Sequence, residues 1–200
     1  MRKDYEIILN LIPENSKVLD IGCSDGELIT YLENKGISAQ GVELNQEKVI
    51  KCLEKGLDVI HGDINLIVED FPFNQFDYCL LTQTIQAVQE PDQLLNTLKK
   101  VSKNIIVSFN NSARLSKISN FLLTGSFDSL LKKANSDHWY NTDYIHPCSI
   151  KDFKKLATDL DLKIISTFDV LSQKKFENGK IPSNFCLLYT SDAADEPVCV

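Results

Sequence analysis

The sequence has no long apolar run, no closely spaced pair of cysteines and no excess of basic residues. None of its apolar stretches approaches the roughly 20 residues that span a bilayer, and the N-terminus lacks the apolar core of a signal peptide. Its 21 Lys and Arg are outnumbered by 28 Asp and Glu, for a net charge of -7, whereas proteins that bind nucleic acids are usually basic. These absences predict a cytoplasmic protein that binds neither membranes nor nucleic acid.

The six cysteines are scattered along the chain, and no two of them form a C-x-x-C pair. Cys23, Cys52 and Cys79 lie in or beside apolar segments, so we expect buried free thiols in a reducing compartment. No cluster of residues has the spacing of metal ligands, and no nucleophile triad stands out. The sequence therefore predicts free thiols and no metal site.

Short apolar runs alternate with amphipathic stretches, and the 200 residues suffice for one domain with a buried core. The pattern predicts strands over residues 17–22, 38–43, 57–61, 76–82, 104–109 and 162–168, and helices over residues 27–35, 91–101 and 113–123, with two more that begin after Asn45 and Ser149. Serial strand–helix–strand units imply right-handed crossovers. The predicted fold class is α/β, a Rossmann-like and mostly parallel twisted sheet with helices on both faces.

The end of the sequence has an unusual composition. Residues 186–196 match, in one reading frame, the translation of a common transposase sequencing adapter. We therefore expect residues 1–185 to form the single domain and residues 186–200 to be a non-native tail from adapter read-through; a genuine acidic tail is the alternative. The last strand would then be missing, or replaced by the apolar run at 185–190. Native genomic DNA that continues through the codons of the tail would contradict this hypothesis.

A cradle for a ligand is predicted at residues 18–28, which read VLDIGCSDGEL. An acid near the end of a strand, Asp20, is followed by Gly22, a turn, Gly26 and a helix, so backbone can approach a ligand closely. The spacing differs from the dinucleotide motif G-x-G-x-x-G, and there is no Walker lysine. A sulfonium cofactor that carries an ammonium and a carboxylate suits this loop, with Asp20 facing the ammonium and backbone amides the carboxylate.

Two further acids follow the next two predicted strands. Glu43 ends the second strand, where a carboxylate can accept hydrogen bonds from a ribose diol. Asp63 follows the third strand, where it can accept a hydrogen bond from an adenine amino group. Taken singly, Glu43 could be a solvated strand end and Asp63 a turn former. Together with the loop, at successive strand ends, they predict a nucleoside-containing ligand.

Several stretches resemble the MetW family of methionine-biosynthesis proteins, within the class I S-adenosylmethionine (SAM)-dependent methyltransferase superfamily. They are residues 18–28, 41–43, 81–88, 106–109, 139–142 and 145–153, and the similarity runs from about residue 3 to 185. The stretches QTIQAV at 83–88 and WYNT at 139–142 are the more specific ones. By resemblance, the residues that would line the SAM site are Asp20, Gly22, Ser24, Gly26, Glu43, Asp63 and Gln83.

The chain departs from the family pattern at two places. Ser24 stands where the loop usually has its middle glycine, and residues 109–114 replace a stretch that is richer in proline and glycine. On the side of a methyl acceptor, His146 and Tyr140 are candidate catalytic residues, with His138 and Trp139 as walls. The alternative is that the histidine makes structural hydrogen bonds and that the aromatic residues belong to the core or an interface.

Two classes of function remain open. The resemblance implies a SAM-binding accessory protein of methionine biosynthesis that acts with, or regulates, a homoserine O-acyltransferase. The alternative is a SAM-dependent methyltransferase for a small molecule, with Gln83 and residues 110–146 shaping the acceptor site. A well-placed base in the pocket would favour the enzyme, whereas an exposed apolar patch near Trp139 would favour the partner protein.

Overall fold

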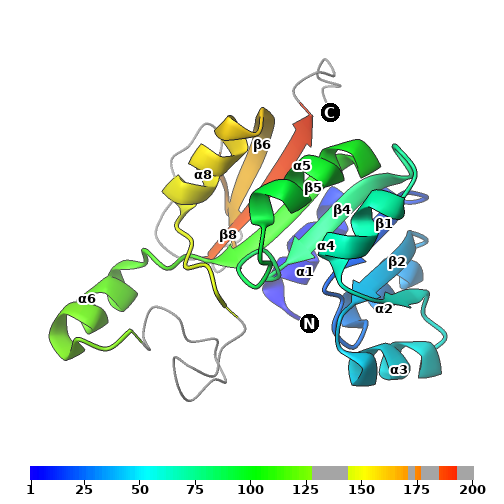
Figure 1. Cartoon of the computed structure of the whole chain (residues 1–200), viewed down its shortest axis with the longest axis horizontal. Helices are drawn as coiled ribbons and strands as arrows, with labels where there is room; N and C mark the ends of the chain where they lie inside the picture. The colour runs from blue at the N-terminus through cyan, green and yellow to red at the C-terminus, as the bar shows by residue number, and fades with distance from the viewer. Residues whose placement is uncertain (128–143, 171–173, 177–184, 193–200) are drawn as a thin grey trace.

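The computed structural model describes residues 1–127, 144–170, 174–176 and 185–192. Its strands form one sheet in the order β3-β2-β1-β4-β5-β8-β6-β7 (Figure 1). The strands are β1 (Lys17–Ile21), β2 (Ser38–Glu43), β3 (Val59–His61), β4 (Phe76–Thr82), β5 (Ser102–Asn110), β6 (Leu162–Asp169), β7 (Lys174–Phe176) and β8 (Phe185–Asp192). The helices are α1 (Lys3–Leu11), α2 (Glu27–Asn34), α3 (Gln46–Glu54), α4 (Ile64–Ile67) with a 3-10 turn at Val68–Asp70, α5 (Pro91–Val101), α6 (Leu115–Thr124) and α8 (Ile150–Asp159).

The first five strands are parallel, as the alternating pattern predicted. Each is joined to the next by a segment that crosses one face of the sheet, so the carboxyl ends of all five lie along one edge. The predicted α/β fold class is therefore confirmed. None of the helices in the described part of the chain has the length and apolarity that a membrane crossing requires.

Helices cover both faces of this sheet, because alternate strand residues are apolar on both sides. Val18 packs in a core cluster with α1, α2 and α3, whereas its neighbour Leu19 packs in a second cluster with α4, α5 and α8. In Figure 1, α4, α5 and α8 lie in front of the sheet. Phe109 of β5 and Phe153 of α8 stack in the second cluster, with ring centroids 5.3 Å apart.

Local helix signals are confirmed at three places. The Asn45 side chain accepts a hydrogen bond from the Lys48 amide and begins α3, and Pro91 begins α5. Ser149 and Asp152 form the reciprocal capping box of α8. Helix α3 buries Val49 and Cys52 and leaves two of its apolar residues, Ile50 and Leu53, exposed.

The end of the sheet follows one of the two sequence-based alternatives, in which the apolar run at 185–190 takes the place of the last strand. Strand β8 is present and runs antiparallel between β5 and β6, and β7 pairs with β6 at the outer edge. Residues 186–192, which we expected outside the domain, thus belong to the sheet. Their origin from adapter read-through stays a hypothesis. Helix α1, which no sequence signal predicted, packs in the cluster on the other face through Ile7 and Ile8.

Candidate functional site

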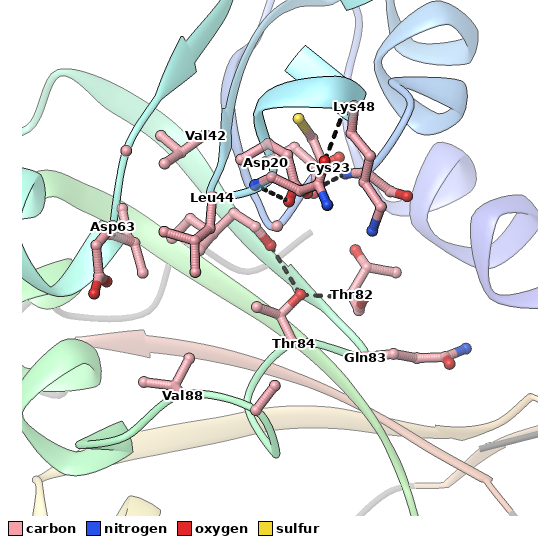
Figure 2. Close-up of a pocket in the computed structure, with 18 of the residues that line it drawn as sticks. Asp20, Cys23, Val42, Leu44, Lys48, Asp63, Thr82, Gln83, Thr84 and Val88 are labelled. Carbon is pink, nitrogen blue, oxygen red and sulfur yellow. Dashed lines mark hydrogen bonds between the residues drawn. The ribbon is translucent and has the colours of Figure 1, made fainter. Parts of the chain in front are cut away.

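A cavity of about 740 Å³ lies at the carboxyl edge of the parallel strands. Six of the seven predicted binding residues line it: Asp20, Gly22, Ser24, Glu43, Asp63 and Gln83. They come from the ends of β1, β2, β3 and β4, which explains how residues 63 positions apart meet. Figure 2 shows Asp63 at one end of the pocket and Gln83 at the other, with Asp20 between them. Gly26 does not line the cavity but begins α2 with a φ of 76°.

The loop after β1 is a tight turn with three residues in the left-handed region. Gly22, Ser24 and Gly26 have φ values of 72°, 56° and 76°. A Cβ on Gly22 would lie 2.7 Å from the Thr84 hydroxyl oxygen, so a side chain there would clash as well as strain the backbone. The position where Ser24 replaces the usual glycine therefore has a conformation that glycine favours.

The loop after β1, here called the cradle loop (residues 22–26), is hydrogen-bonded to β2 through its backbone amides. The N–H groups of Gly22 and Cys23 donate to the Val42 carbonyl, over 2.8 and 3.2 Å. The Ser24 N–H donates to Oε2 of Glu43 over 2.8 Å. These three amides are thus occupied within the protein, and the sequence-based idea that they bind a ligand carboxylate does not fit this arrangement. The cationic side chains that line the same cavity are Arg2 and Lys48.

Asp20 is buried without a full set of partners. Its side chain is 2% exposed, and within the described part of the chain Oδ1 has no hydrogen-bond partner. Burial raises the pKa of this carboxyl group to about 7; Arg2 opposes that shift and Glu43 adds to it. A buried polar atom without a partner is unfavourable, so this position is suited to a ligand group that is cationic or donates a hydrogen bond.

Glu43 and Asp63 combine a structural role with free acceptor capacity. Both oxygens of Glu43 accept backbone N–H groups, from Ser24 at 2.8 Å and Asn45 at 2.9 Å. Oδ1 of Asp63 accepts from the backbone and side-chain nitrogens of Asn65, at 2.9 and 2.8 Å, and begins α4. A carboxylate can accept about four hydrogen bonds, so both acids can still bind a ligand while they hold their turns.

The loop after β4 forms the opposite wall. Gln83 has a φ of 60°, and a hydroxyl beside it, Oγ1 of Thr84, donates to the Ile21 carbonyl over 2.9 Å (Figure 2). This hydrogen bond ties the β4 loop to the end of β1. Strained residues of this kind tend to occur where a ligand or a switch requires them. The motif QTIQAV thus provides a pocket wall whose shape depends on β1.

Gln86 joins three segments of this wall. Its side chain, 2% exposed, donates to the carbonyls of Asn110 and His146 and accepts from the Asn110 amide at 3.0 Å. The Asn110 side chain in turn donates to the hydroxyl of Tyr144 over 3.1 Å. Tyr144 lines the cavity, so Gln86 helps to position one of the segments that line the pocket.

Sequence reasoning missed the contribution of α1 and of the segment after residue 143. Arg2, Tyr5 and Tyr144 line the cavity, but no local motif marks them. The Arg2 guanidinium pairs with Asp4 and lies 4.4 Å from the centre of the Tyr5 ring. The only available signal was a basic and an aromatic residue three positions apart, which is common on helices.

Of the two catalytic candidates, only His146 lies in the described part of the chain, and it lies outside the pocket. His146 is not among its lining residues, and its Nε2 lies 3.1 Å from the Gln89 carbonyl oxygen. Tyr140, with His138 and Trp139, lies outside the described residues. Of the described lining residues from β4 onward, Tyr144 alone carries a titratable side chain. Among the described residues, no group of three His, Cys, Asp or Glu side chains is placed to hold a metal ion.

Solved structures with the same fold include a SAM-dependent methyltransferase from Methanosarcina mazei, with a TM-score of 0.68 at 17% identity over 93% of this chain and 96% of that one. The cyclase SpnF has a TM-score of 0.66 at 14% identity, over 95% of this chain and 80% of that one. The strand order and the pocket at the carboxyl edge therefore define a protein of the SAM-dependent methyltransferase fold. The profile of the family "Methionine biosynthesis protein MetW" matches residues 2–189, and the chain belongs to this family.

A curated relative extends this assignment. The chain is 32% identical over 170 residues to "Bifunctional methionine biosynthesis protein MetXA/MetW" from Rhodopirellula baltica. The match covers 80% of this chain and 27% of that relative, so the chain corresponds to about a quarter of the longer protein.

Proposed function

We propose that the protein binds SAM and acts with, or regulates, a homoserine O-acyltransferase of methionine biosynthesis. The observation that carries the cofactor half is the buried Asp20 carboxyl group, which faces the cavity with one oxygen unpartnered. Two further acids, Glu43 and Asp63, line the same cavity at the next two strand ends. One pocket therefore offers three acceptors to a ligand that is rich in donors.

The residues present suit each part of SAM. Asp20 would face the ammonium, and Arg2 or Lys48 would face the carboxylate in place of the occupied loop amides. Glu43 would accept from the ribose hydroxyls and Asp63 from the adenine amino group, beside an apolar wall. That wall includes Val42, Leu44, Ile64 and Val88.

The partner half of the proposal is supported by the Rhodopirellula baltica relative, whose name joins MetXA and MetW in one chain. SAM is a downstream product of methionine. A protein that binds SAM can therefore make the activity of the acyltransferase depend on the SAM concentration. We place this activity in the cytoplasm, in keeping with the buried free thiols of Cys23, Cys52 and Cys79.

Calorimetric titration of SAM at pH 8 tests the cofactor half, with Asp20→Asn as the variant and the exposed Asp159→Asn as its matched control. We expect micromolar affinity for the wild type and control, and a loss of at least about tenfold for Asp20→Asn, as for a charged hydrogen bond. Glu43→Ala is a less direct probe, because Glu43 also holds two backbone amides. If the wild-type protein bound no SAM, the cofactor proposal would be wrong.

An activity assay tests the partner half. Purified homoserine O-acyltransferase from the same genome is assayed alone, with this protein, and with this protein and SAM. We expect the acyltransferase rate to depend on this protein and to change as SAM reaches its dissociation constant. A rate that is the same in all three mixtures would contradict the regulatory role.

A methyltransferase is the second candidate, because the fold is shared with such enzymes. Bound SAM would supply an electrophilic methyl group on its sulfonium. Since the described acceptor wall holds no histidine or carboxylate, the pocket favours acceptors that are already nucleophilic and need no general base. The cyclase SpnF has the same fold, so the fold alone does not decide whether a protein is a methyltransferase. Formation of S-adenosylhomocysteine with a panel of amines and thiols would support the enzyme.

A further inference from the structure

Helix α6 has no buried residue, whereas each of the other described helices buries at least one side chain. In Figure 1 it leads away from the sheet and lies to the left of the body of the molecule. A helix of ten residues is marginal by itself in water, because most helical stability in proteins comes from the packing of an apolar face. The position of α6 thus requires an explanation.

The helix carries an exposed apolar stripe. Leu115, Ile118 and Leu122 follow the i, i+3, i+7 spacing of one helix face and are 72%, 38% and 76% exposed. Leu123, 85% exposed, adds to the apolar surface within the helix, and Phe127, 59% exposed, extends it past the helix end. Large apolar side chains gathered in this way mark an interaction surface.

The charges around the stripe limit what can cover it. Residues 113–127 contain two basic side chains, Arg114 and Lys117, and no acid, although the whole chain has a net charge of -7. A second copy of this chain, packed helix against helix, would bring like charges together without an acid opposite them. A different protein, with an apolar groove bordered by carboxylates, complements the stripe better.

We propose that the α6 face, defined as Leu115, Ile118, Leu122, Leu123 and Phe127, is the docking surface for the homoserine O-acyltransferase. This inference rests on the proposed function. In the Rhodopirellula baltica relative, MetXA and MetW are joined in one chain, which supports an association between the two proteins. The exposed apolar stripe of α6 is the surface that we assign to this association.

The position of α6 also connects this surface to the pocket. The helix begins at Leu115, a short connection after the end of β5, where Gln86 holds the Asn110 backbone and the Asn110 side chain holds Tyr144. Tyr144 lines the cavity. A partner seated on α6 would therefore bind next to the segment whose Asn110 side chain holds a residue of the pocket.

Surface plasmon resonance with the full chain and purified acyltransferase from the same genome tests the proposal. The variants are Leu122→Asp and Leu123→Asp on α6, and the control is Leu53→Asp, an exposed leucine on α3. We expect the wild type and Leu53→Asp to bind equally within twofold, and each α6 variant to bind at least tenfold more weakly. SAM titration of every variant should give the wild-type dissociation constant, which shows that the domain is folded.

The outcomes separate this inference from the proposed function. Equal acyltransferase binding by the α6 variants overturns the docking surface but leaves the partner intact. An absence of binding by the wild type overturns both the docking surface and the partner, while SAM titration still decides the cofactor separately. A dimer of this chain in sedimentation velocity, dissociated by Leu122→Asp, would assign α6 to a second copy and overturn the proposal.

Discussion

The carboxyl group of Asp20 changes its charge within the range of ordinary buffers, because burial raises its pKa to about 7. If the ionised form holds the ammonium of SAM, affinity should be highest above pH 7 and should fall by up to about tenfold per pH unit below it. Calorimetric titration between about pH 5.5 and 8.5 measures this. Asp20→Asn should bind weakly with a flat profile, and a flat profile for the wild type would contradict the assigned role.

Substitution of Ser24 by glycine tests whether the positive φ in the cradle loop strains the backbone. With a φ of 56°, a non-glycine residue costs about 1–2 kcal/mol, which Gly avoids at a smaller cost in unfolded-state entropy. We expect Ser24→Gly to raise the free energy of unfolding by about 0.5–1 kcal/mol, measured by urea denaturation. The control Ser38→Gly lies in β2, where glycine should destabilise by a similar amount. A loss of stability in Ser24→Gly would show that its side chain makes a stabilising contact.

The acids of the site could be predicted from the sequence, but its cationic and aromatic walls could not. Asp20, Glu43 and Asp63 lie at or just after the ends of strands that local periodicity reveals, and the carboxyl ends of parallel strands meet at one edge. Arg2 and Tyr144 reach the same cavity only through the packing of segments distant in sequence. No local sequence pattern indicates that packing. The hydrogen bonds of the cradle-loop amides to β2 depend on tertiary packing as well.

At the scale of elements, Gln86 ties the loop after β4, the end of β5 and the segment before α8 together. Gln86→Ala removes three side-chain hydrogen bonds to the backbone of Asn110 and His146 and leaves a small cavity at a buried position, which should cost about 1–3 kcal/mol of unfolding free energy. Hydrogen exchange at residues 144–149 should accelerate, and SAM should bind more weakly. The exposed Gln93→Ala on α5 is the control.

Unchanged exchange at residues 144–149 in Gln86→Ala would mean that other contacts hold this segment. The backbone of Gln86 keeps two such contacts in the variant, because its carbonyl accepts from the amides of Ile145 and His146 at 2.9 and 3.0 Å. The prediction therefore concerns faster local opening and a weaker pocket wall, and not detachment of the segment.

Elements were predictable where their ends carry local signals. The helix at Pro91 and the capping box of Ser149 and Asp152 can be identified in the sequence, and the structure confirms both. Helix α1 has no side-chain cap at Arg2 and precedes the first strand, so neither a cap nor the strand–helix alternation indicated it. Its apolar residues are explained only by the sheet face that they cover.

At the scale of the whole molecule, the order of the last strands could not be read from the sequence, because pairing of β8 with β5 joins residues about 80 positions apart. The register from Asn104 with Ser191 to Asn110 with Phe185 places β8 inside the sheet. This pairing consists of main-chain hydrogen bonds, which strands with many different side chains can form. A segment of foreign origin can therefore occupy the position when its length and alternation fit.

Deletion of residues 185–200 tests the importance of that position. Without β8, the edges of β5 and β6 face each other unpaired in the interior of the sheet, and the exposed backbone groups and apolar faces favour aggregation. Because a domain is stable by only about 5–15 kcal/mol, we expect the shortened chain to lose its cooperative thermal transition and to sediment as aggregates. Deletion of residues 193–200 keeps β8 and should leave the melting temperature within about 2 °C of the full chain. A cooperative, monomeric chain without residues 185–200 would show that β5 and β6 close directly on each other, and that β8 is an addition to a sheet already complete.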